Sequence, residues 1–566
     1  MLDAGDAGQG GAGGSGGGGS AGVGGAGGSG AGGSGGGGTG GGGPGGAAVV
    51  VDAGQPLVPG DPGPADVRFE VRSDRDVHPI SALIYGTNTA PEHGTAAAQS
   101  PAQNRFGALR MGGNRLTAYN WENNASNAGS DWNHQNDDYL WSVASPGEAV
   151  KVVVDAAKTI GAAVLLTVPI LDHVAADTLG DGDVNKTPNY LTARFKQNRA
   201  LKGSPLTLLP ATTDAFVAQD EFVNWVKSTQ AGARILFSLD NEPDLWSSTH
   251  PRIHPNDLTY DELCTRNITF ATMIKNVWPS APVTGFVSYG WNGYTNLQGA
   301  PDNAAKGDFT DYWLKKMQAA HTAAGKRLVD YLDLHWYPEA EGSGTRITGP
   351  ETSAAVVAAR VQAPRSLFES TYKEKSWIVD SSGEAIRLIP RMKEKIASNY
   401  PGTQLAFTEW NYGGGGHISG AVASADVLGI FGREGVGLAN FWELNPSEAF
   451  SYAAFRVFRN FDGAGAAFGD TSIIATSTLP ATATVYASLD ASDPTRVVIV
   501  AINKTTSSKT VGLTVAHPTN FTKLAAYVLA GASPTIVSAS PVTATSTNAF
   551  RATLPALSVT VLVPKP

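Results

Sequence analysis

Eight short apolar runs recur between residues 80 and 460, and stretches with helical periodicity separate them. Strands that are buried on both faces have this continuous apolar character, and strands that alternate with helices form parallel sheets. Eight such units predict a closed (β/α)8 TIM barrel over residues 80–465, with an open doubly wound sheet as the competing fold. The runs are Ile84 to Asn88, Ala108 to Asn114, Ala163 to Pro169, Ile235 to Pro243, Val283 to Ser288, Val329 to Pro338, Leu405 to Asn411 and Leu438 to Leu444.

Residues 466–566 have a different pattern, in which Thr, Val, Ala and Ser dominate. Short alternating segments without helical periodicity predict an antiparallel β-sandwich. Residues 65–79 include a similar alternation from Val67 to Val71, so we expect a strand there that joins the sandwich from the other end of the chain. The C-terminal segments are Ala483 to Leu489, Arg496 to Asn503, Thr510 to Val515, Lys523 to Leu529 and Leu557 to Val563.

Residues 1–64 form a Gly/Ser/Ala-rich segment that ends in a run with four prolines. More than half of the first 46 residues are glycine, a composition that favours a flexible coil over a packed core. We therefore predict a disordered linker over residues 1–64. Tethers of this kind hold a domain away from a surface, so we expect an extracellular or cell-surface-tethered protein whose signal segment lies outside this sequence.

The charge and cysteine content exclude several classes of partner and site. The net charge is −9, and four of the acidic residues lie in the first 64 residues, which hold no Lys or Arg. The remainder therefore offers no electrostatic reason to bind nucleic acid or an anionic membrane. The single cysteine, Cys264, excludes an intramolecular disulfide and a Cys-based zinc cluster, and no run of about 18 apolar residues would span a bilayer. We expect a monomer.

Two glutamates end apolar runs on opposite sides of the predicted barrel. Glu242 ends the fourth run and Glu409 lies near the end of the seventh. The carboxyl ends of barrel strands form the active-site face, and two carboxyl groups that meet there are what glycoside hydrolysis requires. We predict that Glu242 is the general acid/base. Glu409 is then the nucleophile if the carboxyl groups are about 5–5.5 Å apart, whereas a wider gap indicates inversion.

The other strand ends are rich in aromatic and amide groups, which bind the apolar faces and the hydroxyls of sugars. We expect Arg110 to hold a carboxylate such as Glu409 at the barrel mouth, with a purely structural ion pair as the alternative. The predicted substrate-binding residues are Asn241, Trp121, Trp246, Tyr289, His335, Trp336, Tyr337, Trp410 and Trp442.

The segment from Arg110 to Trp132, read together with four shorter motifs, resembles glycoside hydrolase family 44. The motifs are Asp240-Asn-Glu-Pro243, Asp333-Leu-His-Trp-Tyr-Pro338, Phe407-Thr-Glu-Trp-Asn411 and Asn440-Phe-Trp-Glu443. The resemblance, which extends from about residue 66 onward, implies a barrel with a β-sandwich and retaining cleavage of internal β-1,4-glucosyl bonds in cellulose-type glucans or xyloglucan. By motif it assigns the acid/base to Glu242 and the nucleophile to Glu409.

The same resemblance implies that a β-glucan polysaccharide is the substrate and that the chemistry needs no cofactor. It also implies a structural calcium ion, for which the oxygen-rich loop from Glu122 to Asp138 is the candidate. No ligand spacing in the sequence locates a metal, so its position stays open. Two alternatives remain: a non-catalytic cell-surface protein that binds polysaccharide, and an enzyme that uses the same carboxyl pair on xylan or mannan.

Overall fold

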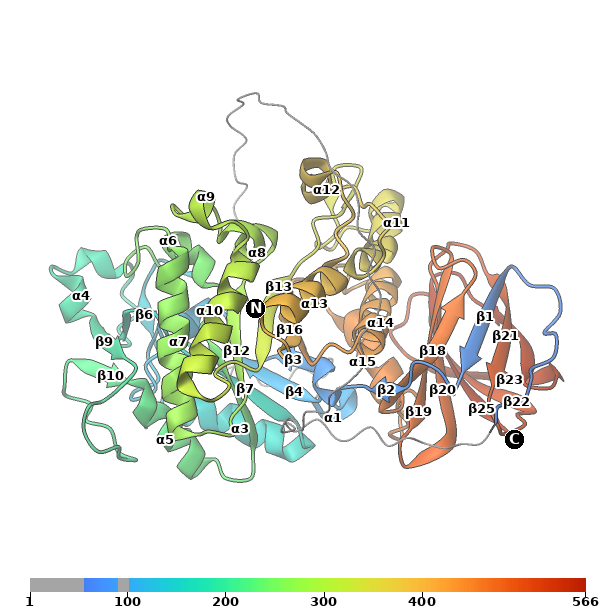
Figure 1. The fold of residues 1–566 in the computed structure, drawn as a ribbon, viewed down its shortest axis with the longest axis horizontal. Coiled ribbons are helices and arrows are strands. Elements are labelled where there is room, and N and C mark those ends of the chain that lie inside the picture. The colour runs from blue at the N-terminus through green and yellow to red at the C-terminus, as the bar shows by residue number, and fades with distance from the viewer. Residues whose placement is uncertain (1–54, 90–100) are drawn as a thin grey trace, which may run out of the picture.

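The computed structural model describes residues 55–89 and 101–566, so most of the predicted linker, residues 1–54, lies outside the described residues. The described chain forms two units that lie side by side, a barrel surrounded by helices and a β-sandwich (Figure 1). The predicted fold class is confirmed, with every barrel strand falling on a predicted apolar run.

The eight barrel strands are parallel, and each pairs with its neighbours in chain order until β17 pairs with β3 and closes the ring. Closure places the carboxyl ends of all eight strands around one mouth. The strands are β3 (Gly86–Asn88), β4 (Ala108–Met111), β7 (Ala163–Val168), β11 (Arg234–Leu239), β12 (Val283–Ser288), β13 (Tyr331–Trp336), β16 (Gln404–Trp410) and β17 (Leu438–Phe441).

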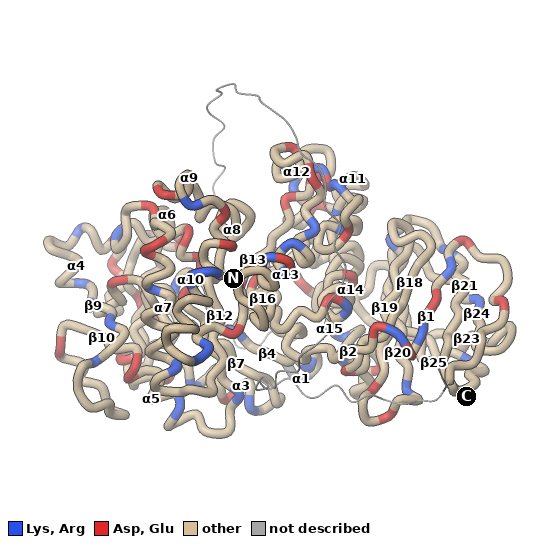
Figure 2. The backbone as a smooth tube through the Cα atoms, viewed as in Figure 1, with Lys and Arg blue, Asp and Glu red and all other residues tan. Residues whose placement is uncertain are grey.

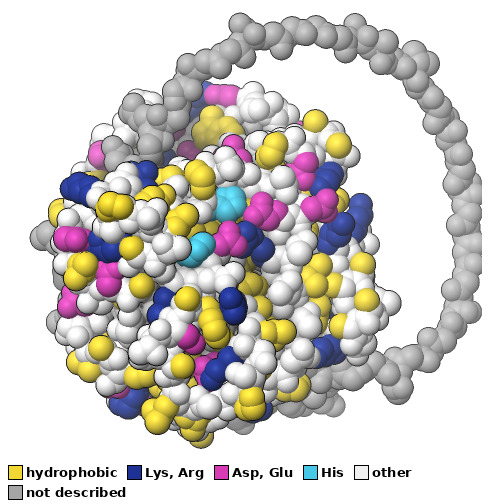
Figure 3. Space-filling view, turned by 90° about the vertical axis from the view of Figure 1, so that its left-hand side faces the viewer, with side chains coloured by type: hydrophobic (Ala, Val, Ile, Leu, Met, Phe, Trp, Pro, Cys, Tyr) yellow, Lys and Arg dark blue, Asp and Glu magenta, His cyan; other side chains and the backbone are white. Residues whose placement is uncertain are grey.

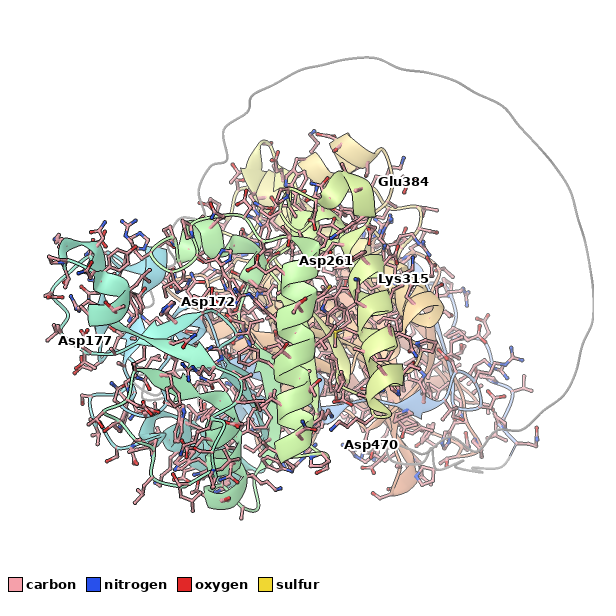
Figure 4. The ribbon with its side chains drawn as sticks, turned by 60° about the vertical axis from the view of Figure 1, so that its left-hand side comes forward. Asp172, Asp177, Asp261, Lys315, Glu384 and Asp470 are labelled. Carbon is pink, nitrogen blue, oxygen red and sulfur yellow. The ribbon has the colours of Figure 1, made fainter. Side chains whose placement is uncertain are left out.

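Helices of three or more turns alternate with most of these strands and cover the barrel. The helix α7 begins at Tyr260 because the side-chain oxygen of Thr259 accepts a hydrogen bond from the backbone N–H of Glu262 at 3.1 Å. Figure 4 shows α7 and α10 side by side, with the labelled Asp261 on the first and Lys315 on the second. The longer helices are α3 (Glu148–Ile160), α5 (Gln219–Thr229), α7 (Tyr260–Val277), α10 (Phe309–Ala324), α11 (Ala354–Gln362), α13 (Leu388–Asn399), α14 (Ile418–Arg433) and α15 (Ala449–Arg459). The shorter ones are α1 (Pro101–Asn104), α2 (Asn114–Thr117), α4 (Tyr190–Ala193), α6 (Trp246–Thr249), α8 (Trp291–Asn296), α9 (Asn303–Lys306) and α12 (Trp377–Ser382).

Three small sheets lie in segments that connect barrel strands to the following helices. The largest follows β7, and buried ion pairs tie it to its surroundings: Lys196 Nζ lies 2.9 Å from Glu122 Oε2 on the segment after β4. Asp172 and Asp177, labelled in Figure 4, lie in this insertion, and Arg194 pairs with Asp177 at 2.7 Å. The strands are β8 (His173–Ala175), β9 (Phe195–Arg199) and β10 (Phe216–Ala218), then β5 (Ser126–Asn127) with β6 (Asn136–Asp137), and β14 (Glu341–Gly342) with β15 (Thr345–Arg346).

The sandwich combines both ends of the described chain. Strand β1 pairs in parallel with β21 and antiparallel with β18, so a strand that precedes the barrel bridges two strands that follow it (Figure 1). Val67, Phe69 and Val71 of β1 are buried in the sandwich core. The strands are β1 (Val67–Arg72), β2 (His78–Pro79), β18 (Thr471–Ser477), β19 (Ala483–Asp490), β20 (Asp493–Asn503), β21 (Lys509–Ala516), β22 (Lys523–Ala530), β23 (Val537–Ser546), β24 (Ala549–Leu554) and β25 (Ser558–Lys565).

The linker predicted over residues 1–64 is too long, because its last residues bind along the sandwich. The backbone N–H of Leu57 donates to the carbonyl of His517 at 3.1 Å, and that of Gly60 donates to the carbonyl of Thr547 at 2.8 Å. A Cβ on Gly60 would lie 2.3 Å from Ser546 Oγ, so this close approach requires glycine. The prolines that exclude regular structure here still allow an extended segment to bind along the sandwich, which is why the composition was misleading.

A buried polar cluster joins the two units. Helix α14 is buried along almost its whole length, and it contacts β19, β20 and β25 of the sandwich. The carboxylate of Asp426 on this helix accepts hydrogen bonds from Thr484 Oγ1 at 2.6 Å and from the hydroxyl of Tyr486 at 2.7 Å. Lys504 Nζ forms an ion pair with the same carboxylate at 2.6 Å, and neither side chain is more than 1% exposed.

We expect Lys504→Met to lower the free energy of unfolding by about 3 kcal/mol, because it leaves a buried carboxylate without its counter-charge. Urea denaturation followed by tryptophan fluorescence measures this loss. The matched control is Lys151→Met, which removes the exposed i,i+4 partner of Asp155 and should change stability little. Equal losses in the two variants would show that the buried pair has no special importance.

Charged side chains of both signs are distributed over both units (Figure 2). The face in Figure 3 likewise carries Lys and Arg next to Asp and Glu, with no extended surface of one sign. Among the helices of residues 55–89 and 101–566, none is both long and apolar enough to cross a bilayer.

Candidate active site

Glu242 lies just beyond the end of β11, where the backbone turns sharply. Asp240 and Glu242 have φ angles of 69° and 44°, in the left-handed region that residues with a side chain rarely adopt. The buried carboxylate of Asp240 holds this turn by accepting a hydrogen bond from the backbone N–H of Ile170 at 2.7 Å, on the segment after β7. The turn therefore determines where the Glu242 side chain leaves the backbone.

Glu409 lies on β16 and accepts hydrogen bonds from two side chains that come from other parts of the barrel. Arg110 on β4 donates from Nη1 to Glu409 Oε1 at 2.7 Å, and Tyr337, which follows β13, donates its hydroxyl to Oε2 at 2.8 Å. The side chain of Arg110 is fully buried and that of Glu409 is 7% exposed. The negative charge of Glu409 is thus countered by a guanidinium group in a largely dry environment.

The two carboxyl groups meet at His335. Its Nδ1 lies 2.8 Å from Glu242 Oε1, in a hydrogen bond whose direction depends on the tautomer, and 3.4 Å from Glu409 Oε2. One oxygen from each carboxyl group and one nitrogen of His335 all lie within 4.8 Å of one another. This spacing is shorter than the separation of about 6.5–9.5 Å between the carboxyl groups of inverting enzymes.

The two carboxyl groups have different electrostatic surroundings. Burial raises the pKa of Glu242 to about 7, with Arg110 opposing the shift and Asp131 adding to it. Burial lowers the pKa of His335 to about 4, so the imidazole is neutral near pH 7. A neutral imidazole can share a proton with Glu242 without adding a second positive charge beside Arg110. Glu242 therefore suits a proton donor, whereas Glu409 has the charge-stabilising contacts of a nucleophile.

Arg110 connects three strand ends through its guanidinium group. Besides Glu409, it donates from Nη1 to Asn88 Oδ1 at 2.9 Å and from Nη2 to Asn241 Oδ1 at 2.8 Å. A Cβ on Gly112 would lie 2.3 Å from Arg110 Cζ, so glycine is needed for the guanidinium to cross beneath the mouth. The expected contact between Arg110 and Glu409 is therefore present.

Several predicted sugar-binding residues have accessible surface near the mouth. Tyr289, Tyr337 and Trp442 are partly exposed, and the indole of Trp442 lies against Gly113, where a Cβ would come within 2.7 Å of the ring. Asn241 is buried, and its Oδ1 is already engaged by Arg110. Contact of these residues with a sugar stays a prediction.

Four predicted sugar-binding tryptophans are instead packed in the interior, which contradicts a stacking role. Trp410 is fully buried and lies against Phe431 of α14 and Phe455 of α15. With no exposed ring face, none of the four can stack on a sugar in this structure. They are Trp121, Trp246, Trp336 and Trp410, each at most 2% exposed.

Sequence reasoning missed four side chains that support or border the site. Asp244 accepts a hydrogen bond from Ser288 Oγ at 2.6 Å and ties the segment after β11 to the end of β12. Tyr294 donates its hydroxyl to the carbonyl of His335. Asn88 lies at a strand end, so the sequence could have indicated it. Asp131, Asp244 and Tyr294 lie in connecting segments, where only the tertiary structure shows that they are close to the site.

Two of the four acidic residues in the loop proposed for calcium already have a basic partner. Glu122 is paired with Lys196, Asp137 with Arg115 at 2.5 Å, and these groups do not converge. Within the described part of the chain, the one convergent group of three potential metal-ligating side chains comprises Glu242, His335 and Glu409, where Arg110 opposes a cation. The calcium ion stays a prediction.

Comparisons with known proteins identify the family of the chain. A family model described as glycoside hydrolase family 44 matches residues 125–340. The chain is 37% identical to a family 44 xyloglucanase from Paenibacillus polymyxa solved with xyloglucan, with a TM-score of 0.83 over 88% of this chain and 99% of that one. A family 44 endoglucanase from Clostridium thermocellum, also 37% identical, gives a TM-score of 0.82 with the same coverage.

Among curated proteins, endoglucanase A from Paenibacillus lautus is 39% identical over 459 residues, which cover 78% of this chain and 64% of that protein. The β-mannanase/endoglucanase A from Caldicellulosiruptor saccharolyticus is 40% identical over 487 residues, covering 80% of this chain. The chain spans only 36% of the length of that second protein.

Proposed function

The chain belongs to glycoside hydrolase family 44, and we propose that it cleaves internal β-1,4-glucosidic bonds of cellulose-type glucans or xyloglucan with retention of configuration. The observation that carries this proposal is the approach of the Glu242 and Glu409 carboxyl groups to within 4.8 Å at their nearest oxygens. Retaining glycosidases place their carboxyl groups about 5–5.5 Å apart, because one must reach the anomeric carbon directly.

In the first step, a carboxylate oxygen of Glu409 attacks the anomeric carbon while the bond to the leaving sugar breaks. The leaving oxygen takes the proton of Glu242, whose raised pKa keeps that proton available near neutral pH. Arg110 and Tyr337 hold Glu409 in position for the attack through their hydrogen bonds to its two oxygens.

In the second step, Glu242 is ionised and removes a proton from water. The water oxygen attacks the anomeric carbon, the bond to Glu409 breaks, and the carboxylate of Glu409 is restored. The donors Arg110 and Tyr337 stabilise the charge that returns to this group. Both steps use only side chains of this chain, so no cofactor takes part in the proposed chemistry.

The proposed substrate is a polymer, which places the site of action outside the cell or at its surface. We expect the protein to work as a monomer, because all the groups in these two steps come from one chain. The names of similar proteins include mannanase activity and a bifunctional glucanase-xylanase, so xylan and mannan are the competing substrates.

The test is a panel of carboxymethylcellulose, xyloglucan, xylan and mannan with product sizing and proton NMR of the first products. We expect a rapid loss of glucan viscosity, a broad range of oligosaccharides, and initial release of the β-anomer. Initial release of the α-anomer would overturn retention. If the wild-type protein releases no sugar from any polymer and behaves like a Glu242→Gln/Glu409→Gln double variant, the non-catalytic alternative is favoured.

A further inference from the structure

We propose that Asp131 is a substrate-binding residue that accepts hydrogen bonds from sugar hydroxyls beside Glu242. This inference rests on the proposed function and adds a third carboxylate to the site. Asp131 ends the 3-10 helix η3 (Gly129–Asp131), in the segment that follows β4. It was not among the residues expected from the sequence.

The position of Asp131 is held by its own segment. The backbone N–H of Asp131 donates to the carbonyl of Ala128 at 3.2 Å. Gly129 has a φ of 55°, and a Cβ there would lie 2.4 Å from the carbonyl oxygen of Thr249 on α6. The start of η3 is therefore packed closely against the segment that follows Glu242 in the chain.

A short chain of amides links Asp131 to the catalytic groups. Asn114 donates from Nδ2 to Asp131 Oδ1 at 2.7 Å, and its own Oδ1 lies 3.5 Å from Nδ2 of Asn241. Asn241 in turn accepts from Arg110, the partner of Glu409. Among the described residues, no side chain or backbone N–H donates to Asp131 Oδ2, so this oxygen remains available to a ligand.

The electrostatic effects agree with a position of Asp131 beside the catalytic groups. Asp131 is exposed, yet desolvation by the surrounding protein raises its pKa. Its charge also adds to the rise in the pKa of Glu242, after the larger effect of burial. The packing of Gly129 on Thr249 and the link through Asn114 to Asn241 therefore bring this carboxylate to the side of the site.

The neighbouring residue supplies the second element of a sugar site. Trp132 is 53% exposed, which gives it an accessible apolar ring next to a charged acceptor. Carboxylates form hydrogen bonds to neutral donors worth about 1.5–3 kcal/mol, so the loss of one should weaken binding by roughly 10-fold or more.

The binding test uses the full chain with Glu242→Gln, which prevents turnover, and isothermal titration calorimetry with cellohexaose and a xyloglucan oligosaccharide. Adding Asp131→Asn should raise the Kd about 10-fold or more for the oligosaccharide of the polymer that the enzyme hydrolyses. The amide still accepts from Asn114, so the fold should persist. The matched control is Asp138→Asn, an exposed aspartate of the same segment, which should leave the Kd unchanged.

A second measurement tests whether the charge of Asp131 acts on Glu242, which a merely structural role would not require. In the otherwise unchanged enzyme, Asp131→Asn should move the alkaline limb of kcat/KM to lower pH, because removal of a nearby negative charge lowers the pKa of Glu242. Arg115 also faces Asp131, and its pairing with Asp137 is left intact. The other charged or titratable groups that interact with Glu242, none of them altered, are Arg110, His335, Glu409, Asp244, Tyr294 and Tyr337.

An unchanged Kd together with an unchanged pH profile would overturn the assignment of Asp131. A shift of the pH profile without a change in Kd would also overturn it, since the residue would then act on Glu242 without touching the sugar. If Glu242→Gln alone binds neither oligosaccharide and the enzyme hydrolyses no glucan, the proposed function fails instead. The two failures are thereby distinguishable.

Discussion

Glu409→Gly should reduce hydrolysis of the glucan substrate by roughly 10⁴- to 10⁶-fold, the range seen when a covalent nucleophile is removed. The glycine leaves a small space between Arg110 and Tyr337, and the hydrogen-bond donors of these two residues then have no carboxylate partner. Added azide or formate should enter this space, attack the anomeric carbon and restore cleavage of an aryl glycoside with a good leaving group. The product of rescue by azide should be the α-glycosyl azide.

The matched control is Glu443→Gly, which removes another glutamate beyond a strand end, one that accepts a hydrogen bond from Tyr452. It should keep most of its activity and show no response to azide. Absence of rescue in Glu409→Gly, with the fold intact by circular dichroism, would contradict the nucleophile assignment. A β-glycosyl azide would instead indicate that Glu409 is not the group that first attacks the sugar.

The Glu242→Gln variant should lose about 10²- to 10⁴-fold in kcat on glucan, because the leaving sugar needs a proton. The loss should be much smaller in the first step with aryl glycosides whose leaving groups are already acidic. The wild-type rate should fall as the pH rises through about 7, because Glu242 acts in its protonated form and its raised pKa marks where that form is lost. This alkaline limb should disappear in Glu242→Gln.

Steady-state kinetics across pH with a glucan and a series of aryl glycosides measure both effects. Glu339→Gln, which alters a carboxylate paired with Arg346, is the control and should keep the alkaline limb. An equal loss with every leaving group would argue against proton donation by Glu242. Retention of the limb in Glu242→Gln would assign it to another group.

The barrel could be predicted from the sequence because burial on both faces makes each strand a continuous apolar run. The same reasoning located Glu242 and Glu409, since strand ends in a barrel must converge. It failed for Trp336 and Trp410 because position at a strand end does not determine direction. Side chains alternate along a strand, so His335 and Glu409 face the mouth while the residues after them point toward the helices.

The remaining errors concern segments whose positions depend on distant parts of the chain. The contact of Leu57 and Gly60 with the sandwich follows from backbone groups about 460 to 490 residues away, as the hydrogen bonds to His517 and Thr547 show. Asp131 approaches Glu242 only because the segments after β4 and β11 pack together at the mouth. Neither contact leaves a periodic signal in the sequence.

Strand β1 has a consequence for the order in which the molecule is made. It is synthesised before the barrel, yet its partners β18 and β21 follow some 400 residues later. The barrel can therefore close while Val67, Phe69 and Val71 still await their neighbours, and the C-terminal unit must recruit them once its own strands have been synthesised. Transfer of this strand to the C-terminus by circular permutation would remove that wait and should speed the last stage of refolding.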